Sequence, residues 1–302
     1  MASQGVAFEP PGGGWYQSFA QFYENAGSYA VVRHTARWGL RFVLLAILVA
    51  FWQLIVTGSV FGEFQVLGNG WVNDAILPRT DDVGDEMWFL LFDSGFFWEH
   101  WWQTLRNTLA GFAIGSALGA TLAIAMVLYP RTQAAISDSA IAFEAIPKVT
   151  IIPVLFAWFG FGGQSMMILA IMITFFPVFL TSLVGMTHVP EDDIKLMNSF
   201  RCNRYQMLYM MRFPHALPNV FGGLKIGVAN AMIGAILAEF LFGNSGLGFL
   251  VDLYYNTLRV PEEFAAMILI AITFVILFGA LEIAQRFVVF WSRTAEEIIA
   301  GK

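Results

Sequence analysis

The sequence predicts an all-α integral membrane protein with about six transmembrane helices and both termini in the cytoplasm. Composition is the first observation: of the 302 residues, 58% are hydrophobic and 13% are charged, with a mean hydropathy of +0.65. Soluble domains usually carry about 25% charged residues. Length is the second, because several apolar runs reach the roughly 20 residues that a helix needs to cross a ~30 Å hydrocarbon core. The third is the segregation of acidic and basic residues along the chain, which predicts the topology.

Residues 1–41 are expected to form a cytoplasmic tail. No apolar run precedes Arg33, so the segment does not have the pattern of a cleaved signal peptide. Trp15, Phe19 and Tyr23 recur at helical spacing, which suits an interfacial amphipathic helix, and a disordered tail is the alternative. Arginines at positions 33, 37 and 41 place the tail inside under the positive-inside rule.

Residues 42–61 are the first predicted transmembrane helix, and residues 62–103 form the loop that follows it outside. This loop carries eight acidic residues and a single basic one, Arg79, which is the basic-poor composition of a non-cytoplasmic segment. Its last part, residues 96–102, reads Phe-Phe-Trp-Glu-His-Trp-Trp and is typical of the aromatic belt at a membrane surface. We therefore expect an acidic periplasmic loop with an aromatic interfacial segment.

Residues 104–292 are expected to contain the other five transmembrane helices, and residues 293–302 a cytoplasmic tail. The predicted helices cover residues 108–129, 136–161, 166–186, 219–242 and 264–291. The helix predicted over 136–161 is less regular than the others because Pro147 and Pro153 interrupt it. With this topology, eleven of the sixteen Lys and Arg residues lie on cytoplasmic segments. Gly111, Gly115 and Gly119 recur at every fourth position, which favours close packing against another helix over a hinge.

Ionisable side chains within predicted transmembrane helices are a further signal, because a charge in hydrocarbon costs at least ~2.5 kcal/mol and usually has a partner or a function. Glu144 and Lys148 are four residues apart and are predicted to pair on one helix face, with snorkelling of Lys148 to the interface as the alternative. Lys225 and Glu239 lie about four turns apart on nearly the same face of one helix. They indicate either a lining stripe or, for Glu239, a hydrogen bond between helices.

Residues 190–212 are too polar to cross a membrane. Pro190 and the three acidic residues after it stand where the positive end of a helix dipole favours carboxylates, so two short helices are predicted here. A solvated loop is one interpretation of this interval. A docking surface for a soluble partner is the interpretation that we favour.

The same interval resembles the EAA loop of ATP-binding-cassette (ABC) importer permeases. The residues that carry the resemblance are Lys-Leu-Met-Asn-Ser-Phe-Arg at 195–201 and Arg-Phe-Pro-His-Ala-Leu-Pro at 212–218. The family pattern is Glu-Ala-Ala, three residues, Gly, and then a Pro thirteen residues after that Gly, and Pro214 stands at the matching place. Lys195 replaces the usual Glu, and Arg201 replaces the usual Gly.

Further motifs continue the resemblance in order over about residues 100–292. They are Ile-Pro-Lys-Val at 146–149, Phe-Phe-Pro at 175–177, Gly-Gly-Leu-Lys at 222–225, Ala-Glu-Phe at 238–240 and Gly-Leu-Gly at 246–248. This ordered set is similar to the type I branch that handles nitrate, sulfonates, taurine, bicarbonate, thiamine-precursor pyrimidines or riboflavin.

The resemblance implies the pore-forming permease subunit of an ABC importer, which translocates a small polar solute with a coupling loop at about residues 188–212. It implies as partners two copies of an ABC ATPase, a periplasmic or lipid-anchored solute-binding protein, a second copy of this chain and membrane lipid, but no nucleic acid. The implied location is the bacterial inner membrane. The expected ATPase-docking residues are Asp193, Leu196, Phe200, Arg201, Arg204 and Pro214. The residues expected along the translocation path are Phe176, Lys225 and Glu239.

The energy source is expected on another chain. The sequence has no Gly-x-x-x-x-Gly-Lys-Ser/Thr motif, so ATP and Mg²⁺ are expected on the partner ATPase and no cofactor on this chain. With a single cysteine, Cys202, and four scattered histidines, we expect neither a metal site nor catalytic residues, and a transporter subunit rather than an enzyme. A self-powered secondary transporter or channel, which would show inverted repeats, is the alternative function. A membrane enzyme with a clustered catalytic set is the third.

Overall fold

A computed structural model provides the structure of the chain, and it describes residues 47, 49–52, 78–129, 144 and 146–291. The chain divides into two units, one of residues 1–69 with 297–302 and one of residues 70–296. In the first unit the described residues, 47 and 49–52, are helical. The predicted N-terminal tail, the C-terminal tail and most of the predicted first transmembrane helix lie outside the described residues.

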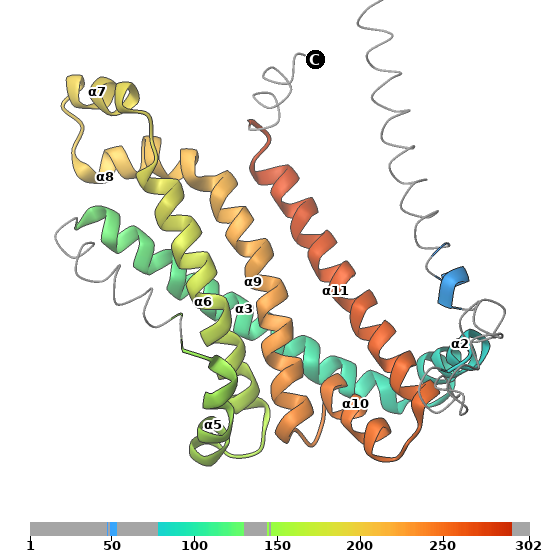
Figure 1. The fold of residues 1–302 in the computed structure, drawn as a ribbon. Helices are drawn as coiled ribbons and strands as arrows, with labels where there is room; N and C mark the ends of the chain where they lie inside the picture. The colour runs from blue at the N-terminus through green and yellow to red at the C-terminus, as the bar shows by residue number, and fades with distance from the viewer. Residues whose placement is uncertain (1–46, 48, 53–77, 130–143, 145, 292–302) are drawn as a thin grey trace, which may run out of the picture. The chain divides into compact units, whose positions relative to one another are not determined.

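The second unit is helical in its described residues, which confirms the all-α prediction for this part of the chain. In Figure 1, α6, α9 and α11 run in similar directions and α3 crosses them. The long helices are α3 (Phe96–Leu128), α6 (Gly163–Thr187), α9 (Phe213–Phe242) and α11 (Val260–Val288). The shorter α-helices are α2 (Thr80–Trp88), α5 (Ile152–Phe159), α7 (Glu191–Ser199), α8 (Arg204–Met207) and α10 (Leu247–Asn256). The π-helical turns η1 (Phe89–Asp93) and η3 (Leu208–Arg212) and the 3₁₀ turn η2 (Lys148–Ile151) complete the elements.

Four helical stretches of the described residues are long and apolar enough to cross a membrane, and they contain α3, α6, α9 and α11. The chain is therefore a multi-pass membrane protein. On α11 the apolar side chains of Val275, Ile276 and Phe287 are exposed. Such a surface suits contact with lipid or with another transmembrane chain.

Helices α3, α6 and α9 pack against one another through small residues. A Cβ on Gly115 would lie 2.8 Å, and one on Gly119 2.6 Å, from carbonyl oxygens of α6. On α9, a Cβ on Gly223 would overlap the hydroxyl of Thr181 in α6. The predicted close packing of the glycine stripe is thus confirmed, since only the missing side chains allow the backbones to approach this far.

Apolar side chains fill the space between these helices at the end nearest α7. They come from α3, α6, η3 and α9, and include Ala123, Met126, Phe179, Met186, Leu208 and Ala216. This core anchors the ends of the polar segment that joins α6 to α9.

The predicted third transmembrane helix, residues 136–161, is wrong as a single helix in its described part. Pro147 has an extended backbone, η2 follows it, and α5 begins only at Ile152 with Pro153 in its first turn. Proline has no N–H to donate, so it interrupts a helix but is tolerated where a helix starts. With eight residues, α5 is about 12 Å long and too short to cross a hydrocarbon core.

Two other boundaries differ from the predictions. Helix α3 begins at Phe96, so the aromatic segment predicted as the end of a loop forms the first turns of a 33-residue helix. Helix α9 begins at Phe213, six residues before the predicted start, and Pro218 lies within it. Both helices are longer than their apolar runs because their polar ends are also helical.

Candidate functional site

The polar segment between α6 and α9 contains the exposed helix α7. Pro190 precedes it, and Glu191, Asp192 and Asp193 occupy its first turn, where the partial positive charge of the helix end favours carboxylates. Lys195 Nζ lies 3.1 Å from Asp192 Oδ1 and 3.7 Å from Glu191 Oε2, so these charges pair along the helix. None of its residues is buried. The short helices predicted for this interval are therefore present, and most side chains of α7 are exposed.

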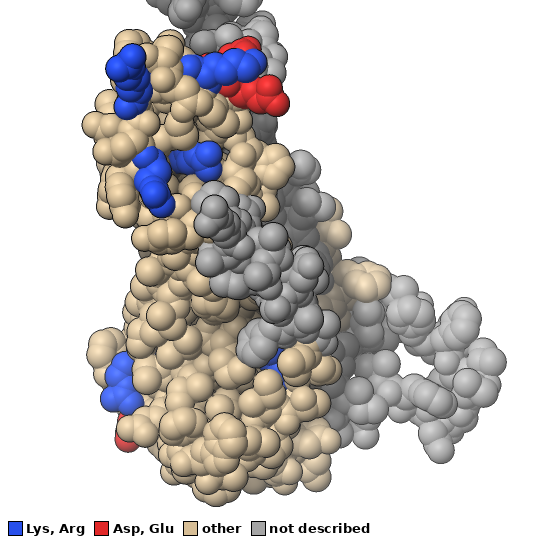
Figure 2. Space-filling view, turned by 90° about the vertical axis from the view of Figure 1, so that its left-hand side faces the viewer, with Lys and Arg blue, Asp and Glu red and all other residues tan. Residues whose placement is uncertain are grey.

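Two large apolar side chains stand out among these charges. Leu196 is 53% exposed, and Phe200, directly after the helix, is 71% exposed. A chain that needed only a solvated loop here would bury or omit them, and exposed apolar side chains rimmed by polar ones mark interaction sites. Figure 2 shows Lys and Arg side chains gathered over this end of the molecule, separated by a broad tan band from the charges at the other end.

Arg201 ends α7 in the left-handed conformation, with φ of +56°. Its N–H donates to the Asn198 carbonyl (2.9 Å), and the Cys202 N–H donates to the Met197 carbonyl (3.3 Å). These two bonds form a Schellman motif, in which the residue occupied here by Arg201 is usually glycine. The position at which the importer pattern has Gly therefore keeps the backbone conformation that glycine favours, although this chain has arginine there.

The segment then returns to the core through α8 and η3. Asn203 caps α8 in a capping box: its side chain accepts from the Gln206 N–H, and the Gln206 side chain accepts from the Asn203 N–H, both at 2.8 Å. Leu208 of η3 is buried in the core between the long helices. Pro214 stands in the first turn of α9, where a missing N–H costs little.

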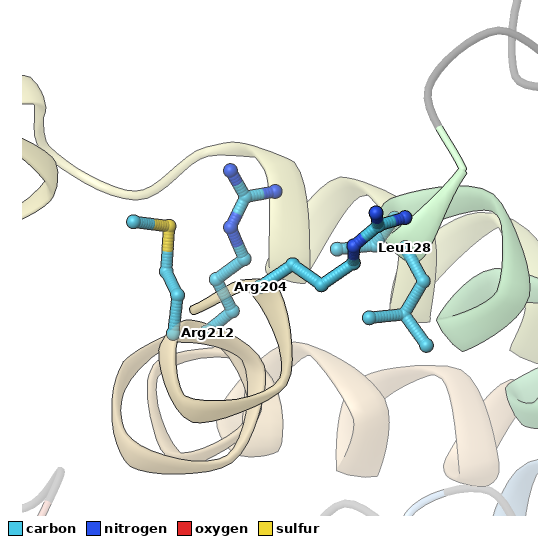
Figure 3. Close-up of a pocket in the computed structure, with 5 residues that line it drawn as sticks. Leu128, Arg204 and Arg212 are labelled. Carbon is cyan, nitrogen blue, oxygen red and sulfur yellow. The ribbon is translucent and has the colours of Figure 1, made fainter. Parts of the chain in front are cut away.

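Arg204 and Arg212 line a cavity of about 270 Å³ together with Val127, Leu128 and Met207. Figure 3 shows both arginine side chains leaving the α8–η3 helix on the same side, with Arg204 extended toward Leu128 at the end of α3. Arg204 is thus directed toward the end of α3, where its guanidinium carbon lies 5.8 Å from the ring centre of Tyr129.

Glu239 lies near the other end of α9 and is fully buried, at 0% exposure. Its Oε2 accepts hydrogen bonds from the Thr104 hydroxyl of α3 (2.7 Å) and from the backbone N–H of Gly248 in α10 (3.1 Å). The predicted alternative for this residue, a hydrogen bond between helices, is present. A buried carboxylate bonded in this way ties α9 to α3 and α10.

The start of α10 is held by the same group of side chains. The Gly246 N–H donates to His100 Nδ1 (2.9 Å), and the Leu247 N–H donates to the Thr104 hydroxyl (2.7 Å). The first N–H groups of a helix have no partner within it, so side chains of α3 and α9 supply the acceptors here. Gly246 has φ of +107°, and a Cβ there would overlap the Glu239 carboxylate.

Lys225 and Phe176 contact other neighbours. Lys225 Nζ lies 5.7 Å from the ring centre of Phe278 in α11. Phe176 is buried in the core, with its ring centre 6.1 Å from that of Phe179. The three residues assigned to the translocation path, these two and Glu239, are thus not brought together in the described part of the single chain, and their assignment stays a prediction.

The ion pair predicted between Glu144 and Lys148 is confirmed. Lys148 Nζ donates to Glu144 Oε2 at 2.5 Å and to the Glu144 carbonyl at 3.3 Å. The lysine belongs to η2, so the pair spans the break at Pro147.

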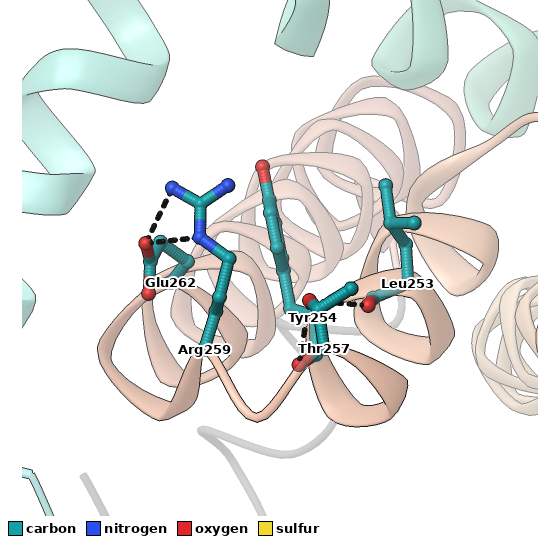
Figure 4. Close-up of polar contacts among 5 residues, drawn as sticks. All are labelled: Leu253, Tyr254, Thr257, Arg259 and Glu262. Carbon is teal, nitrogen blue, oxygen red and sulfur yellow. Dashed lines mark hydrogen bonds and ion pairs between the residues drawn. The ribbon is translucent and has the colours of Figure 1, made fainter.

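A polar group also stabilises the turn between α10 and α11 (Figure 4). Arg259 Nε and Nη2 both lie 2.6 Å from Glu262 Oε1, and the guanidinium carbon lies 5.5 Å from the ring centre of Tyr254. Thr257 donates to the Leu253 carbonyl at 2.7 Å. The turn therefore has its own hydrogen-bonded support outside the apolar core.

Helix α2 adds Glu86 to this turn. Burial raises the pKa of Glu86 above its ordinary value of 4.5, and the Glu262 and Asp85 carboxylates raise it further, whereas Arg259 opposes them. The pKa of Glu86 is thus above that of a free glutamic acid where α2 packs on α11.

Residues 101–293 match the family model described as the binding-protein-dependent transport system inner membrane component. The chain belongs to this family. Its members are the permease subunits of ABC importers, which are transport components rather than enzymes. The resemblance found in the EAA-like loop and in the ordered motifs is thereby confirmed.

Several curated permeases are similar to this chain. The riboflavin transport system permease protein RibX of Chloroflexus aurantiacus is 31% identical over 249 residues, which are 82% of this chain and 88% of RibX. The formylaminopyrimidine transport permease protein ThiX of Halalkalibacterium halodurans is 25% identical, over 72% of this chain and 84% of ThiX. The taurine transport system permease protein TauC of Escherichia coli is 25% identical, over 82% of this chain and 87% of TauC.

The permease fold is also found in a solved structure. A chain from a crystal form of the MetNI methionine ABC transporter in an inward-facing conformation has a TM-score of 0.54 to this chain with 19% sequence identity. The match covers 62% of this chain and 93% of that chain. The two chains share the arrangement of their helices.

Sequence reasoning missed His100, Thr104 and Arg212 as parts of this permease's polar groups. His100 and Thr104 are four residues apart and share one helix face, but His100 lies in a segment that its aromatic residues mark as an interface. Their acceptors and donors come from residues 239–248, and nothing in the spacing along the chain indicates that distant contact. The signal that could have found Arg212 is its position eight residues after Arg204. The two arginine side chains line one cavity because η3 connects them.

Proposed function

We propose that this permease is the pore-forming subunit of an ABC importer that moves a small polar solute across the inner membrane of a bacterium. ATP hydrolysis on a separate subunit would supply the energy, and a periplasmic or lipid-anchored binding protein would deliver the solute. The observation that carries the proposal is an exposed apolar pair, Leu196 on α7 and Phe200 directly after it, at the one described end of the bundle where a charged helix lies free of the core.

The ATPase would dock on Leu196, Phe200 and Arg201, which we name the docking surface. Asp193 flanks it in the first turn of α7, and Arg204 and Pro214 follow on the path back to α9. Two copies of the permease would each bind one of two ATPase subunits, and the ATPase subunits would hold ATP and Mg²⁺. No cofactor is assigned to the permease itself.

Movement of α7 would reach the transmembrane helices directly. Helix α7 is joined to α6 at one side and, through α8 and η3, to α9 at the other. Closure of the ATPase pair on ATP would draw two α7 helices together, and the attached α6 and α9 would swing with them. Hydrolysis would allow the return to the inward-facing arrangement.

The substrate class follows from the relatives only in outline. Their names specify riboflavin, formylaminopyrimidine and taurine. A small polar anion or a heterocycle is the class that we propose for this permease, with Phe176, Lys225 and Glu239 as the residues to test along its path.

Co-purification tests the proposal. The tagged chain is isolated from bacterial membranes in mild detergent, and the ATPase subunit and ATP hydrolysis are measured in the eluate. We expect a stoichiometric ATPase that is lost with Arg201→Glu and retained with Arg286→Glu, a matched reversal on α11. If the chain alone transports solute in proteoliposomes without ATP, it is a self-powered transporter and the proposal is wrong.

A further inference from the structure

The cavity beside η3 combines two positive charges with an apolar wall. Arg204 and Arg212 supply the guanidinium groups, and Val127, Leu128 and Met207 supply the wall. In the part of the chain that the structure describes, neither arginine forms an ion pair with a carboxylate. Arg204 lies with its guanidinium carbon 5.8 Å from the ring centre of Tyr129, a contact that leaves its donors available. Two guanidinium groups on one side of a helix favour an anion with several acceptor oxygens.

The cavity lies at the end of a helix that is long and apolar enough to cross a membrane, and the ends of such helices meet the headgroup region. Val127 and Leu128 are the last residues of α3, one of the helices long and apolar enough to cross a bilayer. Tyr129, Tyr205 and Tyr209 near the cavity are each at least half exposed. Exposed tyrosines gather at membrane interfaces, where one end of the ring is apolar and the other is hydrated.

We infer that Arg204 and Arg212 bind the headgroup phosphate of an anionic phospholipid, whose glycerol and upper acyl chain lie against Val127, Leu128 and Met207. The cytoplasmic leaflet is its source, an orientation that rests on the proposed function. The volume of about 270 Å³ is below the ~300–1,000 Å³ of typical small-molecule pockets, so the cavity suits a headgroup rather than a whole ligand.

The apolar wall distinguishes a lipid from a free anion. Inorganic phosphate would use the two arginines and leave Leu128 and Met207 without a partner. A phospholipid uses both halves of the cavity and is already concentrated at this level of the membrane. Through this lipid the membrane would hold the α8–η3 segment against the end of α3, next to the docking surface.

Lipid binding to the purified full-length permease tests the inference. Native mass spectrometry from detergent measures the Kd for phosphatidylglycerol and for zwitterionic phosphatidylcholine, with no ATPase present. The result is therefore independent of whether α7 docks an ATPase. We expect phosphatidylglycerol to bind more tightly than phosphatidylcholine, with inorganic phosphate and glycerol 3-phosphate unable to displace it at equal concentration.

Substitutions locate the site. Arg204→Gln and Arg212→Gln should each weaken phosphatidylglycerol binding about fivefold, or ~1 kcal/mol, and the double variant about 25-fold. Arg286→Gln, which removes a charge elsewhere on the same predicted side, should leave the Kd unchanged. Leu128→Trp fills the apolar wall while keeping both arginines, and should also weaken binding. Thermal unfolding of each variant checks that it is folded.

Three results would overturn the inference. An unchanged Kd in the folded double variant would show that the arginines do not bind the lipid. An equal loss with Arg286→Gln would show that net charge alone attracts it. Displacement of the lipid by inorganic phosphate at equal concentration would show a site for free anions instead.

Discussion

Replacing Phe200 with alanine removes the most exposed apolar side chain of the docking surface. Phe200 is 71% exposed in the permease alone. Full burial of a Phe side chain stabilises by ~1.5–3 kcal/mol, so covering the exposed share contributes about 1–2 kcal/mol to ATPase binding at each docking surface. Every ~1.4 kcal/mol is a tenfold change, so Phe200→Ala should raise the Kd for the ATPase about 5–30-fold.

Binding of the purified ATPase to the permease in nanodiscs measures this Kd, with biolayer interferometry as the readout. The matched control is Phe287→Ala, because Phe287 is also an exposed phenylalanine but belongs to α11, outside the docking surface. We expect the control to bind as the unchanged permease does. A Kd for Phe200→Ala within twofold of the unchanged value, or an equal loss in the control, would refute the reasoning from exposed apolar area.

Three further predictions concern the backbone and the buried polar groups. Arg201→Gly should raise the free energy of unfolding by about 1 kcal/mol, because glycine adopts positive φ without strain. Arg201→Val should lower the free energy of unfolding, and chemical denaturation in detergent measures both variants. Gly246→Ala should lower the melting temperature, because the added Cβ would overlap the Glu239 carboxylate and the backbone there has φ of +107°. Gly84→Ala is the control and should not lower it, because a Cβ at that position of α2 meets open space. Because the pKa of Glu86 is raised in the folded protein, the stability that α2 contributes should be complete below pH 4.5 and decrease as the pH rises above it. Glu86→Gln should abolish that decrease. Melting curves at pH 4.5 and at neutral pH measure it, and the same difference in melting temperature with and without the substitution would contradict the prediction.

Long apolar runs made the transmembrane helices predictable, because a hydrocarbon core requires about 20 apolar residues from each of them. Their ends were less predictable. The aromatic residues 96–102 suit an interface whether they are looped or helical, and the structure has them in the first turns of α3. Pro147 and Pro153 were recognised as interruptions, but whether such prolines kink a helix or divide it depends on the packing of α5 against its neighbours.

The docking surface could be predicted better than the buried polar groups. The docking surface is a continuous stretch of sequence, so its charge pattern and its proline are visible without the fold. The group around Glu239 joins residues of α3 to residues 135 or more positions further along the chain, a contact that one sequence does not reveal. Arg201 shows that a departure from the family pattern does not by itself reveal the backbone conformation at that position. Arg201 replaces the family's Gly, and the hydrogen bonds of the Schellman motif still impose positive φ at this position.

The two ends of α9 together restrict how an ATPase could move this permease. At one end α9 continues into η3 and the docking segment, and at the other Glu239 ties it to α3 and α10 through buried hydrogen bonds. Between these ends, Gly223 brings α9 against α6 so closely that a Cβ would overlap Thr181. Sliding α9 along its neighbours would therefore break buried bonds and separate helices that touch through their backbones, at a cost of several kcal/mol. A rotation of α3, α6 and α9 as one body keeps all of these contacts, so we expect the solute path to open at the outer surfaces of this body rather than between its helices.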